Sequence, residues 1–312
     1  MKKFSTQEDT RRHISPPRIN KLYTDFNLIS RCSYYRVYQA KYSLTNEIHT
    51  IRMLDTECMF VKRNPEFASS LFIKEILFLC SRLGQPDSIV IENFEMSEGK
   101  IAFVSKNYST VLPLKPNESK PNVKKMLKDI VQDIDFLYSK MNIRNLTIDP
   151  SRICRFQDTD KFFYTDWAAA EAKGEEEESK GGEIRSIRTP LYFAPELRNN
   201  SLSSLPKAAT EIYTLGLTIL ELSGIERRLW DELPLISDDK SYDYVLSTMI
   251  MKKFCEEQKF KPLQNLVQSM LQKDPLKRVK FQDLMLGTSI DKLDYFLTKD
   301  EGLRTEAVPI EG

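Results

Sequence analysis

The fold of this 312-residue chain is decided by one stretch of sequence, Arg188-Thr189-Pro190-Leu191-Tyr192-Phe193-Ala194-Pro195-Glu196. Two shorter stretches follow it further along the chain, Glu211-Ile212-Tyr213-Thr214-Leu215-Gly216 and then Asp274-Pro275-Leu276-Lys277-Arg278. One stretch of this kind is weak evidence for a fold, because short motifs recur by chance. Three stretches in a fixed order are strong evidence when the elements around them agree.

Upstream of the first stretch, the hydrophobic pattern changes from that of strands to that of a helix. Residues 22–62 hold short alternating segments rich in β-branched and aromatic residues, which is typical of antiparallel strands. In residues 68–83 the apolar positions recur every three or four residues, so they share one helix face. This face consists of Phe72, Ile76, Leu79 and Leu83. The predicted strands are residues 36–42, 48–54, 88–91 and 100–104.

The second half of the chain reads mostly as helix. Apolar residues at helical spacing predict a long helix over residues 123–141 and another over 210–222. Residues 143–168 return to short strand-like segments, and 169–193 form a loop that carries the acidic run Glu175–Glu178. These changes divide the chain into a basic N-terminal arm (1–21), a first lobe (22–108), a second lobe (109–290) and a C-terminal tail (291–312).

Composition excludes several classes of function. Lys plus Arg number 46 and Asp plus Glu number 45, so the net charge of +1 gives no general attraction to nucleic acid or to a membrane surface. No apolar stretch approaches the roughly 18–20 residues that span a bilayer. The basic N-terminus lacks the apolar core of a secretory signal. We therefore expect an intracellular protein, in the cytoplasm or the nucleus.

The numbers of cysteine, histidine and glycine residues bear on disulfide bonds, metal sites and phosphate-binding loops. Five scattered cysteines without a C-x-x-C pair, and only two histidines, give little material for a disulfide framework or a metal site. The first of the ten glycines is Gly84, so no glycine-rich phosphate loop precedes it. We expect reduced thiols and no metal.

The three stretches resemble three landmarks of the protein-kinase family. The first is similar to the G-T-P-x-Y-x-A-P-E end of the activation segment, the second to the D-I-W-S-L-G start of the central large-lobe helix, and the third to the late D-P-x-x-R motif. The resemblance covers about residues 22–290. It implies an α+β, bilobal protein-kinase-like fold, with a small antiparallel-sheet lobe that has one main helix and a larger, mostly helical lobe. The loop 166–196 would be the activation segment.

The resemblance also assigns structural roles to several residues. Glu196 and Arg278 are expected to form a buried, charge-assisted pair, and removal of either would cost about 3–5 kcal/mol. Glu211 stands where the family has an aspartate that accepts backbone N–H groups of the catalytic loop. Gly216 is expected to permit close approach of the backbone within its helix.

The phosphate-binding loop of the family is altered in this chain. Its three glycines correspond to Ser30, Cys32 and Tyr35, whose side chains obstruct the approach of backbone N–H groups to phosphate. Two interpretations of Tyr34 and Tyr35 stay open. Their rings either occupy the phosphate space or simply cover the cleft or the sheet.

The phosphate-binding lysine of the family is also replaced. Arg52 stands at its position, and Glu75 matches the helix glutamate that normally pairs with it. Because a guanidinium does not substitute conservatively at a phosphate, the resemblance implies a structural Arg52–Glu75 salt bridge. Such a bridge would lock the first lobe in an active-looking arrangement without ATP.

The catalytic loop carries further changes. Asn145 replaces the catalytic aspartate, and an amide cannot accept the hydroxyl proton as a carboxylate does. Thr147 stands at the usual lysine and Pro150 at the magnesium-binding asparagine, while Asp149 is either a displaced base or a turn residue. Asp166 retains the acid of the D-F-G motif, but alone it would hold a magnesium ion weakly.

These changes lead to a hypothesis of function by resemblance. We expect a pseudokinase, which is a catalytically inactive scaffold or allosteric regulator and not an enzyme. No cofactor is expected, with weak ATP or Mg²⁺ binding left open. One alternative is a nucleotide-binding switch without phosphotransfer. The other is an atypical, weakly active Ser/Thr protein kinase built around Arg52, Asp149 and Asp166.

The partner of such a scaffold would be another protein, either an active kinase or a multiprotein assembly. The connector from Ile225 to Tyr244 mixes apolar and acidic residues, so it is a candidate ledge for a partner. We assign Trp230 and Leu233 to this ledge. The opposing interpretation is that these side chains pack back onto their own lobe.

Overall fold

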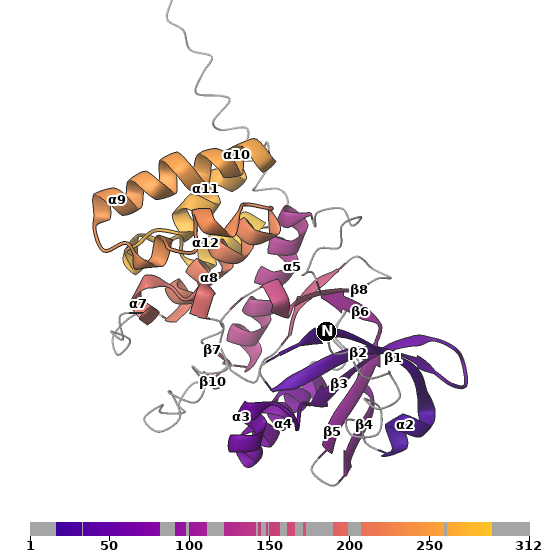
Figure 1. The fold of residues 1–312 in the computed structure, drawn as a ribbon. Coiled ribbons are helices and arrows are strands. Elements are labelled where there is room, and N and C mark those ends of the chain that lie inside the picture. Colours follow the sequence, from indigo (N-terminus) through magenta and orange to yellow (C-terminus); the bar gives the residue numbers. More distant parts are fainter. Residues whose placement is uncertain are drawn as a thin grey trace, which may run out of the picture.

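The computed structural model describes residues 17–32, 34–81, 91–97, 100–110, 122–141, 143–144, 148, 150–156, 161–165, 171–172, 190–198, 207–258 and 261–288. The structure mixes helix and sheet, as the sequence predicted. A five-stranded antiparallel sheet lies at one end of the molecule, and most of the helices gather at the other end (Figure 1). Among the described residues, no helix is both long and apolar enough to cross a membrane.

The large sheet has the strand order β1-β2-β3-β5-β4. Its strands are β1 (Tyr23–Arg31), β2 (Tyr35–Tyr42), β3 (Ile48–Leu54), β4 (Ile91–Ser97) and β5 (Lys100–Lys106). Successive side chains alternate between the two faces of each strand. Arg52 on β3 therefore shares the inner face with its partner Phe103 on β5, whereas Ile51 and Val104 share the outer face.

The inner face of this sheet is covered by a helical segment. It consists of α3 (Met59–Arg63) and α4 (Pro65–Ser81), and α4 packs against β3 and β5. The ring of Phe72 lies 5.6 Å from that of Phe103. Ile76 and Leu79 are buried beside it, so the predicted apolar helix face is the one that packs. Leu83, the fourth predicted member of that face, lies outside the described residues.

The outer face of the sheet carries a helix that the sequence pattern missed. We expected an extended arm up to residue 21, but α2 (Pro17–Leu22) is helical and contacts β1 and β4. Ile19 is fully buried there, and its N–H donates to Glu95 Oε2 at 2.8 Å. The proline pair at 16 and 17 favoured the interpretation as an arm, although proline is well tolerated in the first turn of a helix.

A smaller sheet connects the two ends of the molecule. It pairs β6 (Tyr108–Thr110), β8 (Ile153–Phe156) and β9 (Phe162–Tyr164), while β7 (Ile143–Arg144) pairs with β10 (Glu171–Ala172). Behind it runs α5 (Val123–Phe136), which continues as a π-helical turn, Leu137–Met141. Asp129 and Asp133 on α5 accept the backbone N–H groups of Phe162 and Tyr164, each at 3.0 Å. These carboxylates fix β9 on α5.

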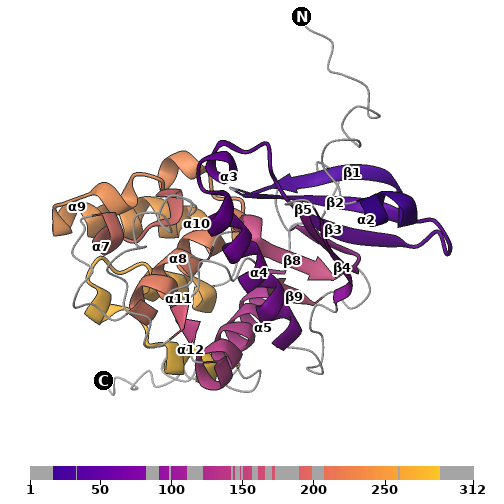
Figure 2. The ribbon, with the colours of Figure 1, turned by 90° about the horizontal axis from the view of Figure 1, so that it is seen from below.

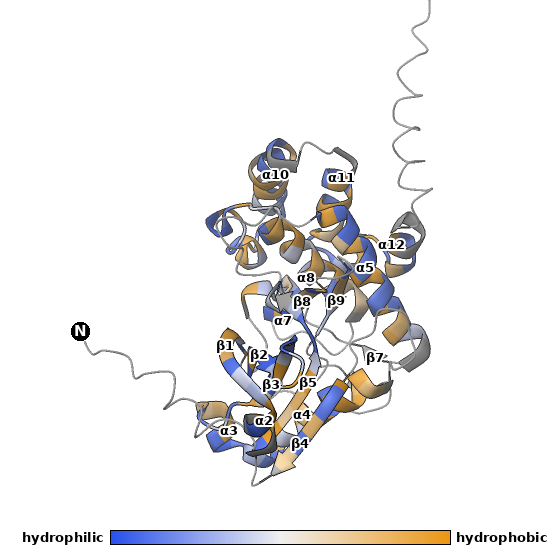
Figure 3. Ribbon diagram, turned by 90° about the vertical axis from the view of Figure 1, so that its right-hand side faces the viewer, coloured by the Kyte–Doolittle hydropathy of each residue, from blue (hydrophilic) through white to orange (hydrophobic). Residues whose placement is uncertain are grey.

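The remaining helices pack around a central buried helix, α8 (Lys207–Leu222), as Figure 2 shows. They are α7 (Pro195–Arg198), α9 (Asp239–Tyr244), the π-helical turn Val245–Ile250, α10 (Met251–Gln258), α11 (Lys261–Met270) and α12 (Phe281–Thr288). Short 3₁₀ turns lie at 150–152, 190–192, 227–229, 233–235 and 275–277. Hydrophobic and hydrophilic residues alternate along α5 and α11 (Figure 3), which is the pattern of helices with one buried face.

Gly216 brings α8 close to the end of α11. A Cβ at this position would lie 2.8 Å from Leu271 Cδ2, 3.0 Å from Leu271 Cγ and 3.3 Å from Met270 Cβ. Real Cβ atoms are very seldom this close to a neighbour, so the absence of a side chain permits the observed packing.

Candidate functional site

The candidate site lies where β3, α4 and β6 meet, and its centre is Arg52. The structure brings Arg52 and Glu75 together as a buried ion pair, with 2.7 Å between Nη1 and Oε1. The two side chains are each only 1% exposed. Arg52 Nε also donates to the hydroxyl of Tyr108 at 2.5 Å. One side chain therefore ties the sheet to α4 and to the first strand of the smaller sheet.

Three aromatic rings surround the guanidinium of Arg52. Its Cζ lies 5.5 Å from the ring centre of Tyr35, 5.5 Å from that of Phe103 and 5.4 Å from that of Tyr108. A cation is attracted to ring faces at such distances, and most strongly where water is excluded. We call Tyr35, Phe103 and Tyr108 the aromatic cage.

Burial and charge fix the protonation states inside the cage. Burial by itself lowers the pKa of Arg52, but the adjoining Tyr108, Tyr35 and Glu75 raise that pKa well above its usual range. Burial raises the pKa of Tyr108, although the Arg52 charge opposes this shift. Burial likewise raises the pKa of the Cys154 thiol to about 11. The cage thus holds a permanent cation beside a neutral phenol and a neutral thiol.

The positions of the family's loop glycines lie along the turn from β1 to β2. Ser30 pairs with Val37 across this hairpin, and Cys32 N–H donates to the carbonyl of Tyr35 at 2.8 Å. Tyr34 and Tyr35 are only 1% and 2% exposed, and their rings meet edge to face at 5.0 Å. Both rings belong to the main hydrophobic core. These buried contacts agree with rings that pack on the inner face of the sheet, which is the second of the two interpretations.

A second buried ion pair, which sequence reasoning missed, supports this hairpin. Arg36 and Asp55 form two contacts of 2.6 Å, from Nε to Oδ2 and from Nη2 to Oδ1. The backbone N–H of Asp55 also donates to the carbonyl of Tyr34. Sequence reasoning made no prediction for Arg36, and the available signal was an acid just beyond the end of β3.

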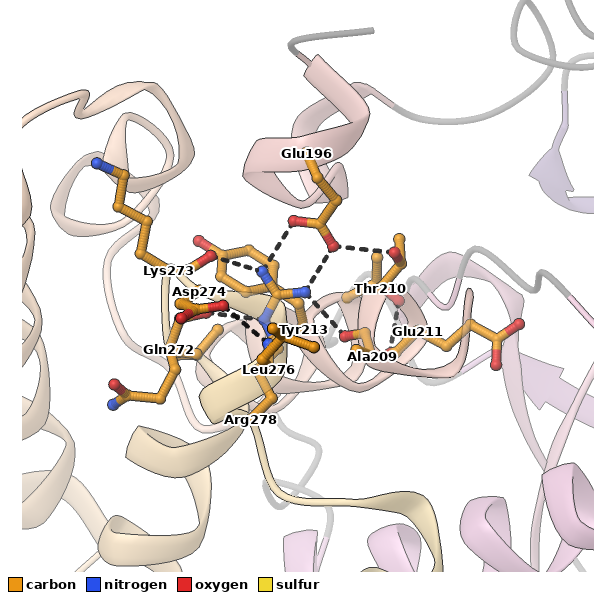
Figure 4. A network of polar contacts seen from close by, with 12 residues as sticks. Glu196, Ala209, Thr210, Glu211, Tyr213, Gln272, Lys273, Asp274, Leu276 and Arg278 are labelled. Carbon is orange, nitrogen blue, oxygen red and sulfur yellow. Dashed lines mark hydrogen bonds and ion pairs between the residues drawn. The ribbon is translucent and has the colours of Figure 1, made fainter. Parts of the chain in front are cut away.

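The Glu196–Arg278 pair is present, as Figure 4 shows. Both residues are buried. Arg278 Nη1 donates to Glu196 Oε1 at 2.6 Å, and Nη2 donates to Oε2 at 2.8 Å. The other guanidinium N–H groups reach three backbone carbonyls, those of Ala209, Gln272 and Lys273. The ring of Tyr213 lies 4.7 Å from Arg278 Cζ. All five N–H donors are used, so this arginine joins α7, α8 and the turn after α11.

The backbone near the predicted catalytic loop is held by α8. Thr214 Oγ1 accepts the N–H of Ile148 at 3.3 Å, and Thr218 Oγ1 donates to the Ile148 carbonyl at 3.0 Å. Pro150 is buried two residues further on, and Glu211 is buried on α8. The signal that sequence reasoning missed was a pair of threonines one turn apart in an otherwise apolar helix.

Several predicted site residues lie outside the described residues. They are Asn145, Thr147, Asp149 and Asp166, together with most of the loop 166–196. The expected contact between Glu211 and the catalytic loop therefore involves backbone that the structure does not describe. Among the residues it does describe, no three His, Cys, Asp or Glu side chains are grouped so as to hold a metal ion.

The assignment of Trp230 and Leu233 to a partner ledge is wrong. They are 0% and 1% exposed, and Trp230 Nε1 donates to the Ile225 carbonyl. The Trp230 ring lies 5.9 Å from that of Tyr192. The connector folds through short 3₁₀ turns that direct these two side chains into the core, whereas Leu235 beside them is 60% exposed.

Comparison with known proteins gives a distant relationship to protein kinases. No family model matches the chain. A serine/threonine-protein kinase, TOS3 of Saccharomyces cerevisiae, is 27% identical over 180 residues in each of two strains. The match covers 52% of this chain and 31% of the yeast protein. The chain thus matches about a third of the length of these relatives, and the similarity indicates a kinase-like relationship.

This similarity corrects one expectation from the sequence. We expected the chain not to be an enzyme, but the proteins that it resembles are named as protein kinases. The expectation rested on single positions such as Asn145, and a changed residue at one position does not show that no other group carries the chemistry. The sequence changes in the cleft are therefore no evidence of inactivity.

Proposed function

We propose that this chain is a two-lobed, kinase-like protein that regulates or scaffolds another protein through α4. The observation that carries the proposal is the Arg52–Glu75 pair inside its aromatic cage. A buried pair with this many partners holds α4 in one position against the sheet. All of these contacts are made by side chains of the chain itself.

The opposite flank of α4 is available to a partner. Ile73 and Leu77 are 36% and 63% exposed on this helix. Glu66 and Ser69 precede them at spacings that place all four on one flank. Glu66 and Ser69 also line an open cavity of about 350 Å³ at the start of α4. Its other lining residues are Leu54, Thr56, Val61, Lys62 and Pro65.

The flank and the cavity suit a protein segment that presents apolar side chains. The lining of the cavity combines the apolar residues Leu54, Val61 and Pro65 with polar residues. Exposed apolar helix positions next to such a cavity are typical of helix or peptide docking. A partner seated here pushes on α4 from the side opposite Glu75. Its binding is then coupled to the Arg52–Glu75 pair, which is the physical basis for regulation.

The test is a binding measurement with a partner first captured from cells and then made as a pure protein. Leu77→Asp is the test variant, and Leu276→Asp is the matched control because Leu276 is 77% exposed far along the chain. We expect Leu77→Asp to weaken binding at least tenfold and Leu276→Asp to leave it unchanged. Equal affinity of both variants and the unmodified protein would overturn the proposal.

A second candidate function is protein phosphotransfer, which the similarity to a named protein kinase favours. Incubation of the purified chain with labelled ATP, Mg²⁺ and a generic Ser/Thr substrate tests it. Asp166→Asn is the control, because the acid at this position is the one that the family uses for magnesium. Transfer that disappears in the variant supports this candidate, and transfer that survives in it points to a contaminating kinase.

A further inference from the structure

The outer face of the five-stranded sheet has a hydrophobic core of its own. Its buried members are Ile19, Tyr23, Tyr38, Ala40, Ile51, Met53, Ala102 and Val104. This outer core is separate from the main core, which lies on the other face and continues into the helices. The strands lie between α4 on one side and α2 on the other (Figure 1).

Of the α2 side chains that the structure describes, those of Ile19 and Leu22 contact this outer core. Ile19 is fully buried in it, and Leu22 packs partly against it. A six-residue helix is far too short to be stable alone, so it forms only where it docks. Its described apolar contacts, those of Ile19 and Leu22, belong to the outer core and not to the main core.

Strand β4 supplies the polar anchor of α2. Glu95 Oε2 accepts the N–H of Ile19 at 2.8 Å, which satisfies a donor that the first turn of a helix leaves without an intrahelical partner. Glu95 lies on the outer face of β4, opposite Ala102. Its neighbours Phe94 and Met96 point to the other face and are 43% and 60% exposed. The strand that holds α2 is therefore an edge strand with exposed apolar residues on its opposite face.

A second anchor follows directly after α2. The hydroxyl of Tyr23 lies 3.2 Å from His49 Nδ1, and the Tyr23 ring lies 5.2 Å from that of Tyr42. The carbonyl of Leu22 accepts the N–H of Ser43 at 2.9 Å. These contacts hold the start of β1, so displacement of the helix stops at this point.

We propose that α2 is a displaceable cover on the outer face of the sheet, held by Ile19 and by Glu95. When α2 detaches, apolar residues of the outer core become accessible and β4 loses its anchor. The N-terminal segment thereby controls one surface of the sheet. This inference stands independently of the proposed function, because it rests on neither α4 nor the aromatic cage.

Limited digestion with trypsin at native conditions tests the cover. Lys21 is exposed, but a protease active site does not accept a chain that is held in a docked helix. Cleavage after Lys21 therefore reports the detached state. We expect Ile19→Ala and Glu95→Ala each to raise the cleavage rate at Lys21 at least tenfold, and this rate to stay independent of urea concentration until the global unfolding transition begins. The matched controls are Ile48→Ala on β3, where the side chain is 45% exposed, and Glu66→Ala on α4.

Two results would overturn the proposal. One is a cleavage rate that does not rise in Ile19→Ala. The other is a cleavage rate at Lys21 that rises with urea as steeply as the global unfolding equilibrium does, because α2 would then detach only when the whole domain unfolds. Hydrogen exchange of the unmodified protein tests the same proposal without any substitution. We expect the amides of α2 to exchange at least a hundredfold faster than those of β3, and equal rates would contradict a separate cover.

Discussion

The Arg278→Ala substitution offers a quantitative test of the packing at the end of α8. It removes five N–H donors at once and leaves the Glu196 carboxylate buried, with the Thr210 hydroxyl as its remaining side-chain donor in the network of Figure 4. Breaking a buried pair by removing one partner costs about 3–5 kcal/mol. In a domain of this size each kcal/mol lowers the thermal midpoint by roughly 2–4 °C. We therefore expect a fall of about 6–20 °C.

Urea unfolding followed by circular dichroism measures the loss in free energy of unfolding, and thermal unfolding measures the fall in midpoint. The matched control is Arg227→Ala, because Arg227 pairs with Glu221 at 2.5 Å but is 55% exposed, and exposed pairs contribute about 0–1 kcal/mol. Replacing the buried pair together, as Glu196→Leu with Arg278→Met, should recover part of the loss because no unpaired charge stays buried. A cost for Arg278→Ala no larger than that for Arg227→Ala would refute the reasoning.

Further substitutions test other parts of the structure. Gly216→Ala should destabilise the protein by about 1 kcal/mol. Overpacking against Leu271 costs about 1–3 kcal/mol, and the better helix propensity of alanine offsets up to about 1 kcal/mol of this. A higher urea midpoint in the variant would contradict the close approach to Leu271. Trp230→Ala should lower the free energy of unfolding by about 3–5 kcal/mol, and an unchanged thermal midpoint would contradict its place in the core. The pKa of Cys154 is raised in the fold to about 11 from 9.0. Stability should therefore fall as pH rises from 9 to 11, by up to about 1.4 kcal/mol per pH unit. The fall should be shallower in Cys154→Ala, and equal slopes in denaturant titrations would contradict a buried neutral thiol.

The resemblance to protein-kinase motifs predicted much of the arrangement around the site. It paired Glu75 on the helix with Arg52 on the sheet. It also paired Glu196 with Arg278, although 82 residues separate these two. Such pairs can be predicted because each partner belongs to a motif whose pairing partner is known in the family. Periodicity predicted α4, α5 and α8 because each buries a regular apolar stripe.

Other features could not be predicted, because they depend on tertiary contacts without a local signal. Ile19 becomes helical only by docking on the outer face, and the two residues Ile19 and Leu22 are too few to show a helical period. Asp129 is buried on α5 because the edge of β9 needs an acceptor for its backbone N–H groups. The sequence left the burial of Trp230 open for a related reason, since three-residue 3₁₀ turns are too short to show a period.

The most direct test of the central claim is hydrogen exchange along α4, measured with and without millimolar ATP and Mg²⁺. We predict slow exchange of the α4 amides in the protein alone, no change on adding nucleotide, and faster exchange in Arg52→Met, because the buried pair with Glu75 sets the position of this helix. Rapid exchange in the protein alone that becomes slow with ATP and Mg²⁺ would contradict the claim. In that case nucleotide, and not the caged ion pair, would position α4.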